Sequence, residues 1–174
     1  MSGGVVSAEV SDMPTLRLPD VLLAQDTPVR LTADDVTRLV EDWFAALDRR
    51  GPVEDLLPFL VPRGLVLHVP EGVVREHEGF RGWHADTLRR FTASAHTLTS
   101  VDVRLNDGPS AEVRLTVAWE GAAHRLALGR RRRLAHEAHQ TWTVARQDGA
   151  PRIRTLAVTG LTAMVEALPL PLPL

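Results

Sequence analysis

The chain has 174 residues and 44% hydrophobic side chains, which suits one domain with a substantial core. Its formal net charge of −2 gives no reason to expect a nucleic acid or an anionic membrane as a partner. Cysteine, tyrosine and lysine are all absent. Disulfides, thiol or phenol chemistry and lysine Schiff bases are therefore excluded.

The N-terminal residues contain no charged segment followed by an apolar one, so we expect no secretory signal. No run of about 18 apolar residues occurs, so no membrane span is expected either. Heavy use of Ala, Val, Leu and Arg beside a single Ile is typical of a GC-rich bacterial genome. Together these features predict a bacterial protein of the cytoplasm.

The N-terminal part of the chain predicts an arm and two helices. Residues 1–30 are interrupted by prolines, which predicts an extended and partly disordered arm. Thr32 is a suitable N-cap for a helix that runs to Arg50, because apolar residues then recur at helical spacing. A Gly-Pro pair ends this helix, and residues 53–60 predict a short second helix.

The next stretch combines a strand, a polar loop and a third helix. Residues 64–69 form an apolar run that ends before a proline, which predicts a strand. Residues 79–91 place aromatic side chains on one face of a helix. The acidic loop between them also holds a histidine and could imitate a metal site. Its spacing matches no familiar ligand pattern, so we expect a solvated loop without metal.

Strand-like segments with turn signals between them make up most of the remaining chain. They span residues 98–105, 111–120, 134–146 and 152–159. In the second segment Val113 and Trp119 share a face, because side chains alternate along a strand. In the third segment the face that carries Trp142 is expected to turn inward.

Two segments fall outside this pattern. Arg130–Arg133 is a basic run between two strands that could contact nucleic acid or an acidic partner. The negative net charge of the chain favours a solvated hairpin end instead. Residues 167–174 alternate leucine and proline, which predicts an extended tail of polyproline II type.

Helices followed by antiparallel strands predict an α+β fold, in which a cone-shaped curved sheet wraps around the N-terminal helices. We expect residues 31–166 to form this single domain. The order of elements, with the strand end LHVP, the helix start GFRGW and the strand RLTVAWEG, resembles the nuclear transport factor 2 superfamily. Within it, the chain is most similar to the SnoaL-like polyketide-cyclase branch. The resemblance implies a cystatin-like α+β barrel over roughly residues 31–165.

The resemblance implies a pocket inside the cone and leaves the reaction open, because the superfamily holds isomerases, cyclases, dehydratases and non-catalytic binders. The two acids of the similar ketosteroid isomerases fall on Val69 and Gln140 here, and the Asp base of SnoaL also falls on Gln140. Scytalone dehydratases use histidines in the pocket, and His96 resembles the position of one of them.

Two histidines are the candidate catalytic residues. His68 lies on the first strand between apolar neighbours, and a neutral imidazole in a dry pocket can accept or donate a proton near neutral pH. His96 could act with it, since a change of parity between Leu98 and Val101 predicts a bulge that turns His96 inward. The alternative for His68 is a hydrogen-bonded histidine of the core or of the surface, and for His96 it is a polar residue at the start of a strand.

The candidate binding residues are polar or aromatic side chains on the expected inner faces. His136 and Gln140 share the face of Trp142, and a ligand would satisfy their hydrogen-bonding groups. For His136 the alternative is a strand end in solvent. The four tryptophans are candidates for an apolar wall against a flat ligand: we expect one or two of them to form it and the others to pack in the core. They are Trp43, Trp83, Trp119 and Trp142.

We therefore expect a small cofactor-independent enzyme of secondary metabolism. It would act on an apolar cyclic or polyketide-like molecule by acid–base chemistry, as a dehydratase, isomerase or cyclase. The alternative is a non-catalytic module that binds a ligand in the cone or a partner on its sheet. Two or more titratable groups that converge in a closed cavity would favour the enzyme. The weakly charged outer face around Thr141 and Thr143 predicts a homodimer.

Overall fold

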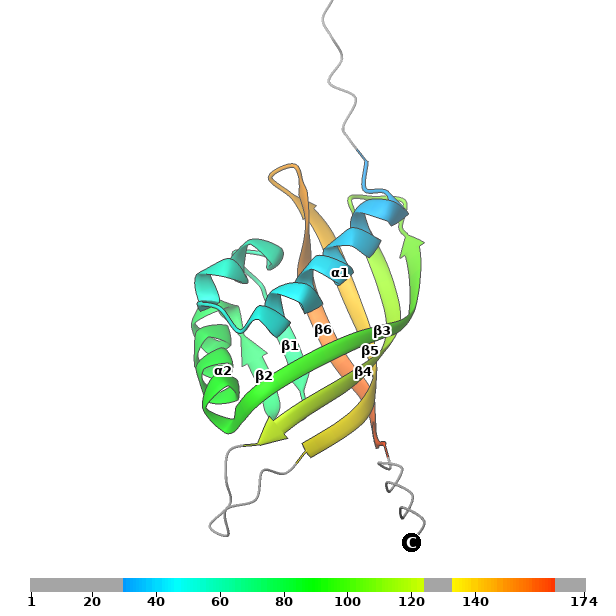
Figure 1. Ribbon diagram of the computed structural model, residues 1–174. Helices are drawn as coiled ribbons and strands as arrows, with labels where there is room; N and C mark the ends of the chain where they lie inside the picture. The colour runs from blue at the N-terminus through cyan, green and yellow to red at the C-terminus, as the bar shows by residue number, and fades with distance from the viewer. Residues whose placement is uncertain (1–29, 124–132, 165–174) are drawn as a thin grey trace, which may run out of the picture.

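The described part of the chain is a six-stranded curved sheet with α-helices on its inner side (Figure 1). This computed structural model describes residues 30–123 and 133–164. The elements in chain order are α1 (Ala33–Arg49), the 3-10 turns η1 (Val53–Asp55) and η2 (Leu57–Phe59), β1 (Val66–Val69), β2 (Gly72–Arg75), α2 (Glu76–Arg90), β3 (Phe91–Leu105), β4 (Ser110–Ala123), β5 (Arg133–Gln147) and β6 (Ala150–Ala163). The α+β fold class expected from the sequence is confirmed.

Three expectations concern segments outside the described residues. These segments are the N-terminal arm before residue 30, the tail 167–174 and most of the Arg130–Arg133 run. Within residues 30–123 and 133–164, no helix combines the length and the apolar character needed to cross a membrane.

Helix α1 begins where the sequence predicts. The Thr32 hydroxyl accepts a hydrogen bond from the backbone N–H of Asp35 at 3.1 Å, and the Asp35 carboxylate accepts one from the N–H of Thr32 at 3.2 Å. This capping box satisfies two of the N–H groups that every helix start leaves without partners. The residues buried on one face of α1 are Val36, Leu39, Val40, Trp43, Phe44 and Ala46.

The predicted second helix is wrong. Residues 53–60 form the two short turns η1 and η2 instead of one helix. Pro58 lies at the start of η2 and has no N–H to donate, and its ring would also clash with the preceding turn of an α-helix. Residues 53–60 therefore form no continuous α-helix, and the chain continues from these turns to β1.

The predicted polar loop before the third helix holds a strand. β2 pairs with β1 in an antiparallel hairpin, and α2 starts at Glu76, three residues before the predicted start. Glu76 has a left-handed φ of 56°, and its carboxylate accepts the N–H of Gly64 at 3.0 and 3.1 Å. Only four residues long and flanked by charges, β2 carries too short an alternation to stand out in the sequence.

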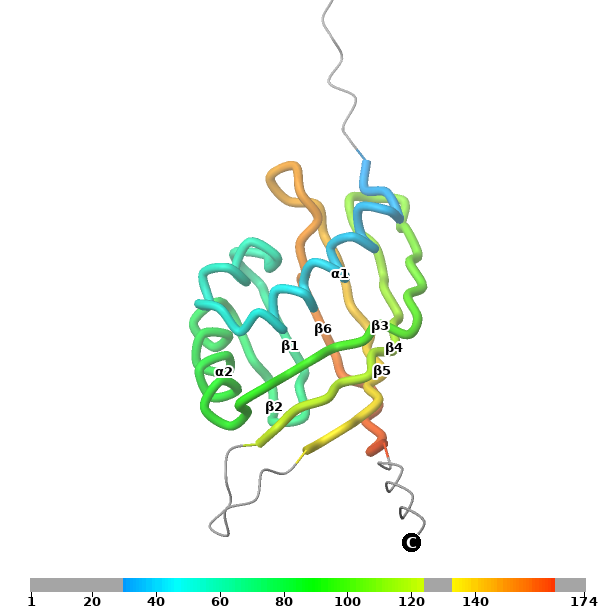
Figure 2. Tube along the Cα trace, in the orientation of Figure 1, coloured from blue at the N-terminus to red at the C-terminus, as the bar shows by residue number. Residues whose placement is uncertain are grey.

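The strands lie in the order β2-β1-β6-β5-β4-β3. All neighbouring strands are antiparallel except β1 and β6, which run parallel. The expectation of a purely antiparallel sheet is therefore wrong for this pair. Helix α2 connects β2, at one edge of the sheet, to β3, at the opposite edge (Figure 2). The chain then returns across the sheet through β4 and β5 to β6, which lies beside β1 and runs parallel to it.

Irregularities in the strand pairing bend the sheet. The β3–β4 register shifts between Leu98 and Ser100, which confirms the bulge predicted from the change of parity. The β5–β6 register shifts twice, next to Gln140 and next to Val144. An extra residue on one strand increases its local twist and bend. The bent sheet curves around α1, which lies across its inner face (Figure 2).

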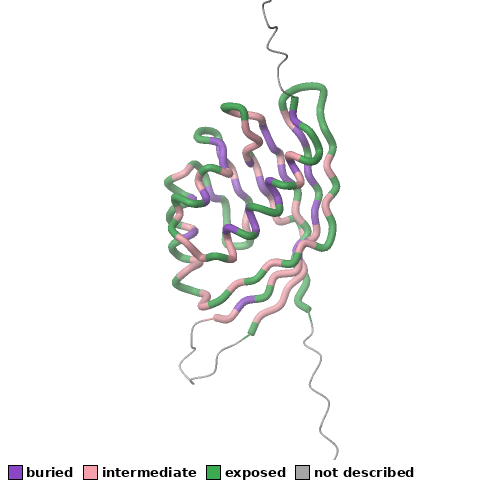
Figure 3. The backbone as a smooth tube through the Cα atoms, turned by 45° about the horizontal axis from the view of Figure 1, so that its top comes forward, coloured by how far each residue is buried: buried purple, intermediate pink, exposed green. Residues whose placement is uncertain are grey.

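The core lies between α1 and the inner face of the sheet (Figure 3). The inner faces predicted for β4 and β5 are confirmed, because Val113, Val117 and Trp142 are buried there. Trp43 from α1 packs against Phe80 of α2 at a ring distance of 5.8 Å. Helix α1, helix α2 and the sheet therefore all contribute side chains to one aromatic and aliphatic cluster.

Helix α2 contributes one polar side chain to this interior. His84 is only 5% exposed, and its ring lies 6.2 Å from that of Phe80. Burial lowers the pKa of His84 below its ordinary value, and the positive charge of Arg50 lowers it further, whereas Glu54 raises it. The folded protein therefore holds His84 as a neutral imidazole at neutral pH.

This burial predicts a pH-dependent loss of stability. As the pH falls through about 6.5, His84 of the unfolded chain takes up a proton that the folded chain resists, so the folded state becomes less stable. We expect His84→Phe to reduce the fall in melting temperature between about pH 7.5 and about pH 5. The exposed His68 provides the control, and His68→Phe should keep the wild-type slope. Equal slopes in all three proteins would contradict the prediction.

The homodimer expected from the outer face stays a prediction. On β5 the outward side chains near the middle are Thr141, which is exposed, and Thr143, which is half-buried. Light scattering at micromolar concentration should give the mass of two chains, and Thr141→Arg with Thr143→Arg should shift it to one. A single-chain mass for the wild type would show that this face is solvated.

Candidate active site

A cavity of about 310 Å³ opens between α1, α2 and the inner face of the sheet. Its volume lies at the lower end of the range for small-molecule sites. Most of its wall is apolar, with aromatic rings from both helices and from β3 and β4. The polar side chains that line it are Arg50, Glu71, His84, Thr87, Ser94, His96, His136 and Gln140, with the indoles of Trp43, Trp83 and Trp119.

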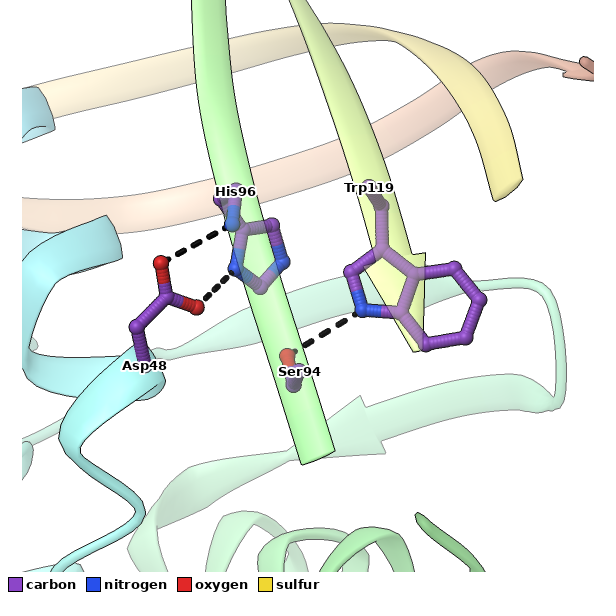
Figure 4. Close-up of polar contacts among 4 residues, drawn as sticks. All are labelled: Asp48, Ser94, His96 and Trp119. Carbon is purple, nitrogen blue, oxygen red and sulfur yellow. Dashed lines mark hydrogen bonds and ion pairs between the residues drawn. The ribbon is translucent and has the colours of Figure 1, made fainter. Parts of the chain in front are cut away.

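His96 on β3 is held by Asp48 on α1 through two hydrogen bonds (Figure 4). The backbone N–H of His96 donates to Asp48 Oδ2 at 2.8 Å, and His96 Nδ1 lies 2.6 Å from Asp48 Oδ1. A carboxylate can only accept, so Nδ1 carries a proton, and in the neutral imidazole the other ring nitrogen, Nε2, then has a free lone pair. Figure 4 shows Nε2 turned away from Asp48, on the side of Trp119.

The bulge in β3 gives His96 its direction. Before the bulge, the inward residues of β3 are Ser94, His96 and Leu98, and after it they are Val101 and Val103. The expected inward position of His96 is therefore confirmed. Its side chain is 14% exposed and its ring packs 5.0 Å from that of Phe44.

Asp48 is the residue of this pair that sequence reasoning missed. It lies in the last turn of α1, where the negative end of the helix dipole disfavours a carboxylate. An acid at that position, directly before two arginines, is the signal that could have marked it. The pairing itself joins residues 48 positions apart in the chain, so only the fold brings them together.

Trp119 and His136 form one side of the cavity. Trp119 Nε1 donates to Ser94 Oγ at 3.2 Å, and the His136 ring lies 5.8 Å from the indole. A Cβ atom on Gly121 would come within 2.4 Å of the Trp119 ring, so glycine is required for the indole to lie along its strand. His136 Nδ1 is buried without a hydrogen-bond partner among the described residues.

Gln140 presents an amide N–H to the cavity because of Trp142. The Trp142 Nε1–H donates to Gln140 Oε1 at 2.9 Å, and an indole nitrogen can only donate. The Gln140 oxygen is therefore used, and its NH₂ group stays available to a ligand. Trp142 itself is 2% exposed and does not line the cavity, so it packs in the core, which was the alternative for each tryptophan.

The other two tryptophans line the cavity as expected. Trp43 is 2% exposed and also packs in the core. Trp83 is half-buried, and its Nε1–H is buried with no partner in the described part of the chain. An unpaired buried N–H costs about 1–3 kcal/mol, so a ligand acceptor beside it would be favourable.

The expected position of His68 is wrong. His68 is exposed and does not line the cavity, whereas its neighbours Leu67 and Val69 do. Side chains alternate between the two faces of a strand, and β1 has the parity that turns His68 outward. The pairing of His68 with His96 that the sequence suggested does not form.

Three polar side chains of the acidic loop have structural partners. Glu71 pairs with Arg90 at 2.9 Å, and His77 Nε2 lies 2.9 Å from the carbonyl oxygen of Val61. Glu76 accepts the Gly64 N–H, as described above. Within the described ranges, no three side chains of His, Asp or Glu gather in a way that could hold a metal ion.

Comparisons with known proteins identify the fold. No protein-family model matches the chain, and no curated protein matches it in sequence. The hexachlorocyclohexane dehydrochlorinase LinA-type3 from Novosphingobium barchaimii is similar with a TM-score of 0.64 at 15% identity, over 79% of this chain and 93% of that chain.

Two further solved structures are similar to the same extent. A proposed scytalone dehydratase from Novosphingobium aromaticivorans has a TM-score of 0.62 at 16% identity, over 76% of this chain and 83% of that chain. An uncharacterised protein with a cystatin-like fold from Caulobacter vibrioides has a TM-score of 0.59 at 18% identity, over 76% and 89% of the two chains. The expected fold is confirmed: the chain has a cystatin-like α+β fold.

Proposed function

We propose that this chain is a cofactor-independent lyase that eliminates a small molecule from an apolar cyclic substrate. The observation that carries the proposal is the Asp48–His96 pair, whose free imidazole nitrogen belongs to a residue of an apolar cavity. A neutral imidazole held in one tautomer is a suitable general base near neutral pH. The names of similar structures, a dehydrochlorinase and a proposed dehydratase, support the same class of reaction.

The proposed reaction begins with His96. Its Nε2 takes a proton from a carbon of the substrate, and the electrons of that C–H bond form the new C=C bond. The bond to the leaving group on the adjacent carbon breaks, and the group departs with its electron pair. The proton on His96 then passes to a departing hydroxide, which gives water, or to solvent where the leaving group is a halide.

Asp48 supports this step without touching the substrate. Its carboxylate fixes the Nδ1–H tautomer and the orientation of the ring, and it stabilises the imidazolium that forms when Nε2 gains a proton. The second hydrogen bond, from the His96 backbone, holds the carboxylate against the strand. The base is thus oriented before the substrate arrives.

The remaining polar groups would bind and orient the substrate. The NH₂ group of Gln140 would donate to a carbonyl or hydroxyl oxygen, and His136 would contact a second polar group near Trp119. The rings of Trp43, Trp83 and Trp119 would cover the flat faces of the molecule. A polyketide-like ring with one or two oxygen substituents fits these contacts.

A substitution of His96 tests the role of the base. His96→Gln keeps much of the shape and some hydrogen bonding but removes proton transfer, so turnover should fall roughly 10²–10⁴-fold. Scytalone and hexachlorocyclohexane are the first probes, with water loss followed by mass spectrometry and halide loss by chloride release.

The matched control is His68→Gln, which changes an exposed histidine outside the cavity. It should keep the wild-type rate. Full turnover in His96→Gln would remove the proposed mechanism. Probe binding by the wild type without any product would instead favour the alternative of a non-catalytic binding module.

A substitution of Asp48 separates orientation from binding. Asp48→Asn keeps one acceptor but loses the charge that selects the Nδ1–H tautomer, so kcat should fall roughly 10²–10⁴-fold. KM should change little, because Asp48 does not line the cavity. Steady-state kinetics on the same probes measure both constants. A change confined to KM would contradict the orienting role.

A further inference from the structure

Arg50 joins the end of α1 to the junction between α2 and β3. It is the C-cap of α1, with a left-handed φ of 54°, and its own N–H donates to the carbonyl of Leu47 at 3.1 Å. Its side-chain Nη2 donates to the carbonyl of Leu88 at 3.2 Å and to that of Phe91 at 2.5 Å. The two carbonyls are 38 and 41 residues away in the sequence.

The carbonyls that Arg50 binds lie where α2 ends and β3 begins. The last carbonyls of a helix have no partner within the helix, and the negative end of its dipole attracts a cation. The guanidinium of Arg50 donates to these carbonyls and also places a positive charge at the end of α2. Its planar guanidinium can direct two N–H bonds to two acceptors at once.

This contact lies beside the Asp48–His96 pair. Asp48 precedes Arg50 by two residues on one side, and His96 follows Phe91 by five residues on the other. Two sets of hydrogen bonds, Asp48 with His96 and Arg50 with Phe91, therefore cross the same gap between α1 and β3. Two attachment points fix both the distance and the angle between these elements, which one point would not.

The start of β3 needs this second attachment. β3 is an edge strand whose strand neighbour in the described sheet is β4 alone. Its pairing with β4 is irregular between Phe91 and Ala93, directly beside the carbonyl that Arg50 holds. A strand start with one irregular neighbour can shift, and such a shift would carry His96 away from Asp48.

We propose that Arg50 is a positioning residue for the proposed base. Its guanidinium holds the first residue of β3 against the end of α1 and so keeps Asp48 in its two-bond contact with His96. The inference rests on the proposed function only where it concerns turnover. The geometric effect on His96 can be measured without any substrate.

The experiment compares two arginines with the same chemistry in different places. Arg152 Nη1 also donates to two backbone carbonyls, those of Pro58 at 3.1 Å and Leu60 at 3.4 Å, and it does not line the cavity. Arg50→Met and Arg152→Met each remove one such double contact. The readout is the low-field proton NMR signal of His96 Nδ1–H, which is assigned by its loss in His96→Gln.

We expect the signal to shift upfield and to exchange faster with water in Arg50→Met, and to stay unchanged in Arg152→Met. Turnover of the probes should fall roughly 10–100-fold in Arg50→Met, the size typical of a misplaced reacting group. Arg50→Lys, which keeps a cation and several donors, should restore most of the signal. Both methionine variants should lose melting temperature, so stability alone does not decide the question.

The outcomes separate this inference from the proposed function. An unchanged His96 signal in Arg50→Met, with a melting temperature like that of Arg152→Met, would overturn the positioning role while the base mechanism stands. A shifted signal together with full turnover in His96→Gln would overturn the mechanism while the positioning role stands. If Arg50→Met does not fold, Arg50→Gln replaces it. If neither folds, Arg50 serves global stability and the inference is wrong.

Discussion

The packing of α1 across the inner face of the curved sheet is the constraint on which the rest of the structure depends. Trp43 and Phe44 are buried in that contact, and burial of each such side chain contributes about 1.5–3 kcal/mol. The same contact brings the last turn of α1 to the first half of β3. The helix therefore closes the core and carries Asp48 to His96 in one arrangement.

The interior is apolar, and this sets what its polar groups can do. Hydrogen bonds and charges are stronger in an apolar surrounding than in water, and unpaired polar groups are more costly there. Most polar groups of the cavity accordingly have a protein partner: Asp48 for His96, Ser94 for Trp119, and Trp142 for Gln140. Two buried groups without one in the described residues, Trp83 Nε1 and His136 Nδ1, belong to residues that line the cavity.

The sheet and helix α1 contribute different groups to the site. The sheet supplies the imidazole, the amide and most of the wall, on strands whose side chains face inward by parity. Helix α1 supplies the carboxylate of Asp48, and its C-cap residue Arg50 supplies the guanidinium; they contact the imidazole and the start of its strand. Under the proposed function, exchange of residues on the strands would change the substrate while His96 and Asp48 stay the same.

Local patterns in the sequence were enough for most of the fold. The N-cap at Thr32, the alternation in β4 and the bulge after Leu98 each depend on a few neighbouring residues, and the structure agrees with all three. The short strand β2 and the turns around Pro58 were missed, because four-residue elements carry too little periodicity to be distinguished from loops.

The sequence by itself determined the α+β class, the inner faces of β4 and β5, and the inward turn of His96, since these follow from spacing along one strand or helix. It did not determine which side chains meet. The apolar neighbours of His68 suggested a place in the cavity, but His68 occupies a position of β1 whose side chain faces outward. Asp48 gave only a weak local signal, and the partners of Asp48 and Arg50 lie about 40 to 50 residues further along the chain. Only the tertiary structure decided these contacts, because the partners are brought together by the docking of α1 and not by their order in the chain.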